Sequence, residues 1–83
     1  MLQRKARALY ARAAKIETEV ALDVSPKMMR TRSVLAVSAT SLWMKAGERE
    51  KAHGTAYHFL NEEGLTEHGR AELRLLLEEA KDD

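Results

Sequence analysis

The side chains best suited to binding a metal ion are three histidines, His53, His58 and His68. Two metal ligands on one helix usually lie four residues apart, as in the HExxH motif, because this spacing puts both on one face. His53 and His58 are five residues apart, so an ideal helix turns them about 140° away from each other. We therefore expect surface histidines, with no metal ion and no other cofactor.

No pair of side chains has the spacing of a catalytic arrangement. Glu62 and Glu63 are adjacent, as are residues 78–79, so the carboxylates of each pair diverge on a helix. Acid–base catalysis instead needs polar groups that converge in a pocket. The serines lie in no GxSxG turn, and the four glycines form no phosphate-binding loop. The sequence therefore favours a protein that is not an enzyme.

Lysine and arginine are concentrated at the start of the chain. Residues 1–32 hold eight basic and three acidic residues, a net charge of +5, whereas residues 33–83 hold six and ten, a net charge of −4. A converging basic surface would suit nucleic acid, although no stacking aromatic or recognition-helix pattern accompanies it. The candidate basic patch is Arg4, Lys5, Arg7, Arg12, Lys27, Arg30 and Arg32.

A second kind of candidate is an adaptable apolar surface for a protein partner. Methionine repacks readily against varied partners because its side chain is long and unbranched. Met28 and Met29 are adjacent, so they cannot both face one core; in the simpler alternative, one is buried and one is merely exposed. The candidate protein-contact residues are Tyr10, Met28, Met29, Val37 and Met44.

These residues are positioned by elements that the apolar pattern predicts to be helices. In the first, over about 2–22, an apolar residue recurs every three or four positions, as on one side of an amphipathic helix. Ser25 is a good N-cap and Pro26 suits a first helical position, so the next helix should begin there. We name the apolar row on the first helix the Leu9–Ile16 stripe; it consists of Leu2, Ala6, Leu9, Ala13, Ile16 and Val20.

Three more helices are predicted, over about 26–46, 48–62 and 67–81. Gly47 suits a tight turn between the second and third, and Thr66 suits the N-cap of the fourth. The residues expected to face inward are Val34, Leu35, Ser38, Ala39, Leu42, Trp43 and Ala46; Ala52, Ala56, Phe59 and Leu60; and Leu73, Leu76, Leu77 and Ala80. The aromatic residues Tyr10 and Tyr57 should lie in or beside the core. The predicted fold is one all-α domain over 1–83, a four-helix antiparallel array built around an αα-hairpin.

Composition places the chain in a broad class. It contains no cysteine, which excludes disulfides and thiolate metal sites and fits the reducing cytoplasm. No apolar run approaches the roughly 18 residues that a membrane span needs. We therefore expect a soluble, cytoplasmic protein without a membrane partner.

The segment 46–52, AGEREKA, resembles the turn of a tetratricopeptide repeat. That repeat has glycine at the turn and alanine five residues later, as Gly47 and Ala52 stand here. Ala39 and Trp43 stand where the repeat has a small or aliphatic residue and then an aromatic one. Phe59 departs from the pattern, which usually has alanine there, and no second copy follows at the 34-residue period. The resemblance implies one degenerate hairpin, with no peptide-groove residues to carry over.

A longer resemblance covers nearly the whole chain. It is similar to a small tetratricopeptide-like family known from cyanobacterial genomes, although Met28, Met29 and His53 depart from that family's pattern. The resemblance implies the helical fold and no particular activity. The segments that carry it are 9–22, 32–35, 38–42, 47–48 and 72–78.

These observations favour a non-enzymatic protein–protein interaction module, with a small nucleic-acid-binding or regulatory protein as the alternative. Self-association is the first partnership to expect, because a short chain has little core to spare. Tyr10, Ala14 and Ala21 extend the apolar surface of the first helix beyond the Leu9–Ile16 stripe, which would give it a second buried side. The basic first half and acidic second half suit an antiparallel homodimer, with Met28 and Met29 near the interface.

Overall fold

The structure is a computed structural model that describes residues 2–81, and of Leu2 only the backbone. These residues form four helices: α1 (Leu2–Asp23), α2 (Met29–Lys45), α3 (Arg49–Leu60) and α4 (Glu67–Lys81). No strand occurs between residues 2 and 81. The prediction of an all-α, four-helix array is therefore confirmed.

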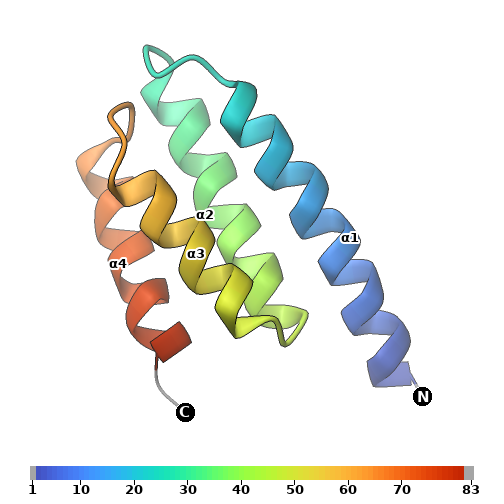
Figure 1. Cartoon of the computed structure of the whole chain (residues 1–83). Coiled ribbons are helices and arrows are strands. Elements are labelled where there is room, and N and C mark those ends of the chain that lie inside the picture. The colour runs from blue at the N-terminus through green and yellow to red at the C-terminus, as the bar shows by residue number, and fades with distance from the viewer. Residues whose placement is uncertain (1, 82–83) are drawn as a thin grey trace.

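Consecutive helices run antiparallel, and α1 lies at one edge of the array (Figure 1). α1 packs chiefly on α2, whereas α2 also packs on α3 and α4, and α3 packs on α4. α2 is thus the helix that the other three share. Since α1 has one principal neighbour, much of its surface is left uncovered.

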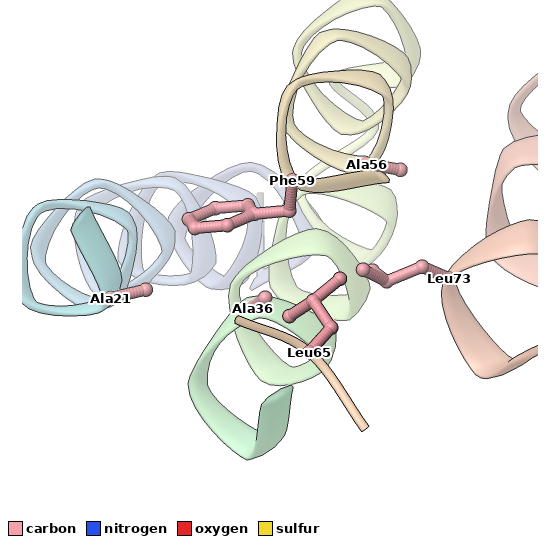
Figure 2. Close-up of a cluster of buried hydrophobic side chains, with 6 residues drawn as sticks. All are labelled: Ala21, Ala36, Ala56, Phe59, Leu65 and Leu73. Carbon is pink, nitrogen blue, oxygen red and sulfur yellow. The ribbon is translucent and has the colours of Figure 1, made fainter. Parts of the chain in front are cut away.

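Two clusters of buried side chains hold the helices together. The first contains Phe59 and Leu73, both fully buried, and Figure 2 shows the Phe59 ring of α3 reaching toward Ala21 of α1. The second is centred on Trp43 of α2. In each cluster alanines surround a few large side chains, which lets the helix backbones approach closely. The full clusters are Ala21, Ala36, Ala56, Phe59, Leu65 and Leu73, and Ala14, Trp43, Ala52 and Ala80.

The ends of the helices follow local hydrogen bonding. Gly47 has a φ of 76°, the left-handed conformation expected at the α2–α3 turn. The Thr66 hydroxyl accepts the Gly69 N–H at 2.9 Å and so caps α4, as predicted. α2 begins at Met29 and not at Pro26, because the Ser25 carbonyl accepts the Met28 N–H at 2.9 Å and closes a separate turn first.

The inward face of α2 differs from the prediction. Val34 is exposed, whereas Ser33, Ala36 and Thr40 are buried. Thr40 donates its hydroxyl to the Ala36 carbonyl at 2.9 Å, so burial leaves no unpaired hydroxyl donor. α2 carries apolar or small residues on every side, and its periodicity therefore selects no single face. Tyr57 on α3, expected beside the core, is also exposed.

Gly69 sets the distance between α4 and α2. A Cβ at this position would lie 2.6 Å from the Cβ and Oγ of Ser33. The Ser33 hydroxyl also accepts the Thr66 N–H at 2.8 Å, so the side chain that would clash is held in place. Gly54 in α3 is the opposite case, because a Cβ there would meet no atom within 4 Å.

We therefore expect opposite effects from the same substitution at two helical glycines. Gly69→Ala should lower the free energy of unfolding by about 1–3 kcal/mol through overpacking against Ser33. Gly54→Ala should raise it by about 0.5–1 kcal/mol, because alanine restricts the unfolded chain without a clash. Urea denaturation measures both. Equal effects at the two positions would contradict the close approach of α4 to α2.

Ala52 tests the packing of the α2–α3 hairpin. It is fully buried beside Trp43, where a longer or charged side chain has no room. Ala52→Glu should destabilise the protein by about 1–3 kcal/mol. Ala71→Glu is the matched control, since Ala71 is exposed on α4. If both variants melt like the parent, Ala52 does not lie in the hairpin interface.

Candidate protein-contact surface

The apolar stripe on α1 faces solvent. Leu9 is 62% exposed, Ile16 59% and Val20 45%. α1 instead enters the core through Ala14 and Ala21, which are fully buried and lie roughly a third of a turn from the stripe on an ideal helix. The expected roles of the two sides are thus exchanged: the alanine side is the core, and the Leu9–Ile16 stripe is the second apolar side. Within the stripe Ala6 is exposed and Ala13 partly buried, while the side chain of Leu2 lies outside the described residues.

The alanine side of α1 is buried because the neighbouring helices supply the large side chains. Trp43 of α2 packs in one cluster with Ala14, and Phe59 of α3 packs in the other with Ala21. The Trp43 indole N–H donates to the Thr18 hydroxyl at 3.2 Å, and that hydroxyl donates to the Ala14 carbonyl at 2.7 Å. The hydrogen bond orients α1 with its alanines toward the two rings. A leucine or isoleucine would not fit beside them.

The stripe also faces away from α3. Thr18 and Leu22 line a hollow of about 320 Å³ between α1 and α3, which also includes Trp43 and Lys51. The Lys51 ammonium lies 5.0 Å from the centroid of the Trp43 ring. On an ideal helix Thr18 points roughly opposite to Ile16. The stripe is therefore on the side of α1 that neither this hollow nor the core uses.

Charged residues are divided along α1. The residues before Ile16 include five basic and no acidic side chains, and the residues after it include three acidic and no basic ones. These groups are Arg4, Lys5, Arg7, Arg12 and Lys15, and Glu17, Glu19 and Asp23. The stripe thus runs from a basic end to an acidic end.

The five candidate protein-contact residues do not form one surface. Met28 and Met29 are both exposed at the start of α2, so neither belongs to the core. Val37 and Met44 are partly buried against the first and second core clusters, respectively. Only Tyr10 adjoins the stripe, and the Lys45 ammonium lies 5.8 Å from its ring centroid. The apolar periodicity of α1 predicts that the stripe is core. For this reason the sequence does not identify the stripe as a contact surface.

The seven candidate basic residues are divided between two ends of the array. Arg7 lies at the α2–α3 turn, where a Cβ on Gly47 would be 3.6 Å from its guanidinium. Lys27 lies in the α1–α2 connection and Arg30 in the first turn of α2. Figure 1 shows this connection at the opposite end of the array from the α2–α3 turn. The helix between residues 5 and 23 alone spans about 27 Å. The residues therefore do not converge on one patch.

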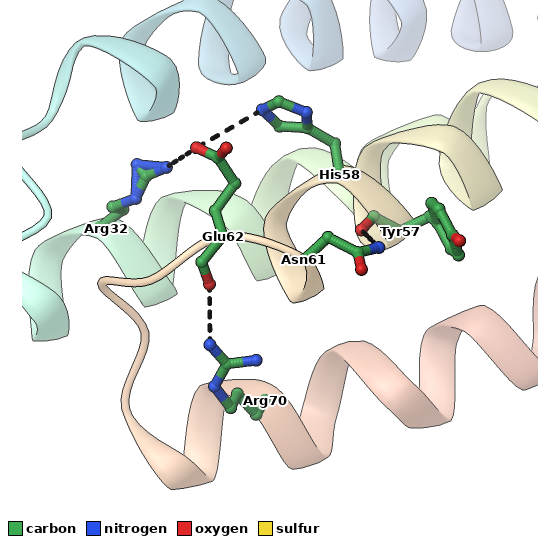
Figure 3. A network of polar contacts seen from close by, with 6 residues as sticks. All are labelled: Arg32, Tyr57, His58, Asn61, Glu62 and Arg70. Carbon is green, nitrogen blue, oxygen red and sulfur yellow. Dashed lines mark hydrogen bonds and ion pairs between the residues drawn. The ribbon is translucent and has the colours of Figure 1, made fainter.

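Arg32 is not part of any basic surface, because it is only 3% exposed. It donates to the Glu62 carboxylate at 3.3 Å (Figure 3), and its guanidinium lies 5.0 Å from the centroid of the Phe59 ring. Its Nε has no hydrogen-bond partner among the described residues. The Arg32 side chain links α2 to the end of α3. Its role is therefore structural, although the sequence predicts it to be a surface cation.

Arg70 extends this network to α4. It donates to the carbonyls of Leu60 at 2.9 Å and Glu62 at 2.7 Å, which are free because α3 ends there. Asn61 donates to the Tyr57 carbonyl at 2.8 Å, and His58 lies 4.0 Å from the Glu62 carboxylate. Figure 3 shows these groups meeting at the α3–α4 connection. The network fixes the connection rather than forming an open site.

A groove of about 500 Å³ lies between α2 and α4, lined by Val34, Val37, Arg30 and Glu72 among others. His68 at its edge pairs with Glu72. His53 stacks on Tyr57, with ring centroids 6.2 Å apart. Within residues 2–81, no three histidine, aspartate or glutamate side chains are grouped to hold a metal ion.

Comparisons with known proteins identify no relative of this chain. No family model matches the chain, and no curated protein or solved structure is significantly similar to it. The tetratricopeptide resemblance therefore stays a prediction. Among the described helices, none has the length and apolar character needed to cross a membrane.

The two sides of α1 should respond differently to one substitution. Ala21→Gln should lower the free energy of unfolding by about 1–3 kcal/mol, because a larger polar side chain enters the core. Ile16→Gln should change it by less than about 0.5 kcal/mol at about 0.1 µM protein, where association contributes little. Chemical denaturation followed by Trp43 fluorescence measures both. A large loss for Ile16→Gln in the dilute chain would show that the stripe is core.

Proposed function

We propose that this protein is a non-enzymatic protein–protein interaction module whose contact surface is the Leu9–Ile16 stripe. The observation that carries the proposal is the row of exposed Leu9, Ile16 and Val20 along the edge helix. Single exposed apolar residues are ordinary, but a continuous row on one helix is typical of a contact site. Covering it would remove apolar side chains from water without disturbing the core.

The form of the stripe favours a helix as the partner. Its residues follow each other at intervals of three and four, the spacing by which an amphipathic helix packs on another. Ala6 and Ala13 are small, so the backbone of a second helix can approach closely at these positions. A partner of about the same length would contact α1 over roughly 30 Å.

The nucleic-acid alternative receives less support. Its basic residues stand at two ends of the array, and Arg32 is buried in an ion pair. Phosphate contacts gain most from cations that follow one backbone. The arrangement of these cations therefore favours a protein contact over a nucleic-acid contact.

Photocrosslinking in the native host tests the proposal. A photoreactive amino acid in place of Ile16 should form a covalent adduct with a protein, whether another copy of the chain or a different one. Leu75 is the matched control position, because it is an exposed leucine on α4, a different helix. We expect an adduct from position 16 and none from position 75. No adduct at position 16, or equal labelling at both positions, would contradict a contact surface on α1.

A further inference from the structure

We infer that the partner of the Leu9–Ile16 stripe is a second copy of this chain, whose α1 packs antiparallel to the first about a two-fold axis near residue 11. This inference rests on the proposed function and adds the identity and orientation of the partner. Two properties of α1 carry it. They are the order of large and small residues in the stripe and the order of charges beside it.

Between residues 6 and 16 the stripe is complementary to itself when reversed. With the axis at residue 11, the numbers of facing residues add to 22, so Leu9 faces Ala13 and Ala6 faces Ile16 of the other copy. Each of these layers joins one large and one small side chain, and each occurs twice. A parallel pair would instead place alanine on alanine and isoleucine on isoleucine. Its alanine layers would then leave gaps between the two helices, and such gaps are unfavourable in a packed interface.

The charges beside the stripe favour the same direction. One flank carries Lys5, Arg12 and Glu19, all exposed and seven residues apart. In an antiparallel pair this flank meets the same flank of the other copy, so Lys5 faces Glu19 twice. The basic half of each α1 then lies beside the acidic half of its partner. A parallel pair would set five cations beside five more, which opposes association.

The other flank carries Gln3, Tyr10 and Glu17. Reversal places Gln3 beside Glu17, and the two Tyr10 side chains face each other across the axis. Tyr10 is 38% exposed. The Lys45 ammonium of α2 lies 5.8 Å from its ring centroid, and the exposed part of the ring is available for this contact. Neither pairing opposes the antiparallel arrangement.

Arg12 distinguishes the two directions. In the antiparallel pair it lies near the axis and faces Arg12 of the other copy, a like-charge contact that weakens the dimer. In a parallel pair it would lie beside Glu17 and strengthen the dimer. Because four layers form a small interface, we expect a dissociation constant of about 1–100 µM.

Cysteine crosslinking of the purified chain tests the pairing, since the chain has no cysteine of its own. Ala6→Cys and Ile16→Cys should form an intermolecular disulfide when the two variants are mixed, because their Cα atoms then face each other. Neither variant alone should crosslink efficiently, since the two copies of residue 6 would be about 15 Å apart along the axis, beyond the reach of a disulfide. Disulfides in each single variant would show a parallel pair and overturn the inference.

Substitution of Arg12 gives an independent readout. Arg12→Gln should tighten the dimer about two- to fivefold, because it removes the like-charge contact. Arg74→Gln, on exposed α4, is the matched control and should leave the dissociation constant unchanged. Sedimentation equilibrium over a concentration series measures both. Weaker association of Arg12→Gln would contradict the antiparallel arrangement.

The association state of the purified chain also distinguishes failure of this inference from failure of the proposed function. If the purified chain keeps the mass of one copy to millimolar concentration and forms no disulfide, the second copy is not the partner. An adduct of position 16 with a different protein in the host would then leave the proposed function standing. If the purified chain forms no dimer and position 16 gives no adduct in the host, both this inference and the proposed function are wrong.

Discussion

The contact of α1 with the rest of the array depends on two aromatic rings that face alanines. Trp43 and Phe59 occupy the space beside Ala14 and Ala21, and the Trp43 hydrogen bond to Thr18 fixes the rotation of α1 about its own axis. Because the rings already fill this space, the core accepts only the small side of α1. The larger residues of the helix are turned outward as a consequence.

This rotation determines what the surface offers. It exposes the Leu9–Ile16 stripe on an edge helix and keeps Tyr10 and the charged flanks beside it. Several polar side chains elsewhere in the array stabilise the fold. Arg32 and Arg70 hold the α3–α4 connection, and Ser33 supports the close approach of α4 at Gly69. The surface of α1 is therefore the one that we propose as the contact site.

Local signals in the sequence predict the fold well. Gly47 and Thr66 mark a turn and a cap whose causes lie within a few residues, and the structure has both. The face of α1 could not be predicted in the same way. Apolar periodicity predicts that the larger residues of α1 face the core. In the structure, the buried face of α1 is determined by the size of the side chains that α2 and α3 place against it. The burial of Arg32 likewise depends on Glu62, thirty residues away.

In the dimer that we propose, two copies of α1 meet antiparallel along the stripe. A spin label at Asp23→Cys reports the orientation directly, because Asp23 is exposed at the end of α1. Pulsed electron paramagnetic resonance on the concentrated chain should give an intermolecular distance of about 36 Å, since the two labels lie twelve residues from the axis on opposite sides. A distance of about 10–20 Å, as in a parallel pair with axes 8–10 Å apart, or no intermolecular coupling at all, would contradict the account.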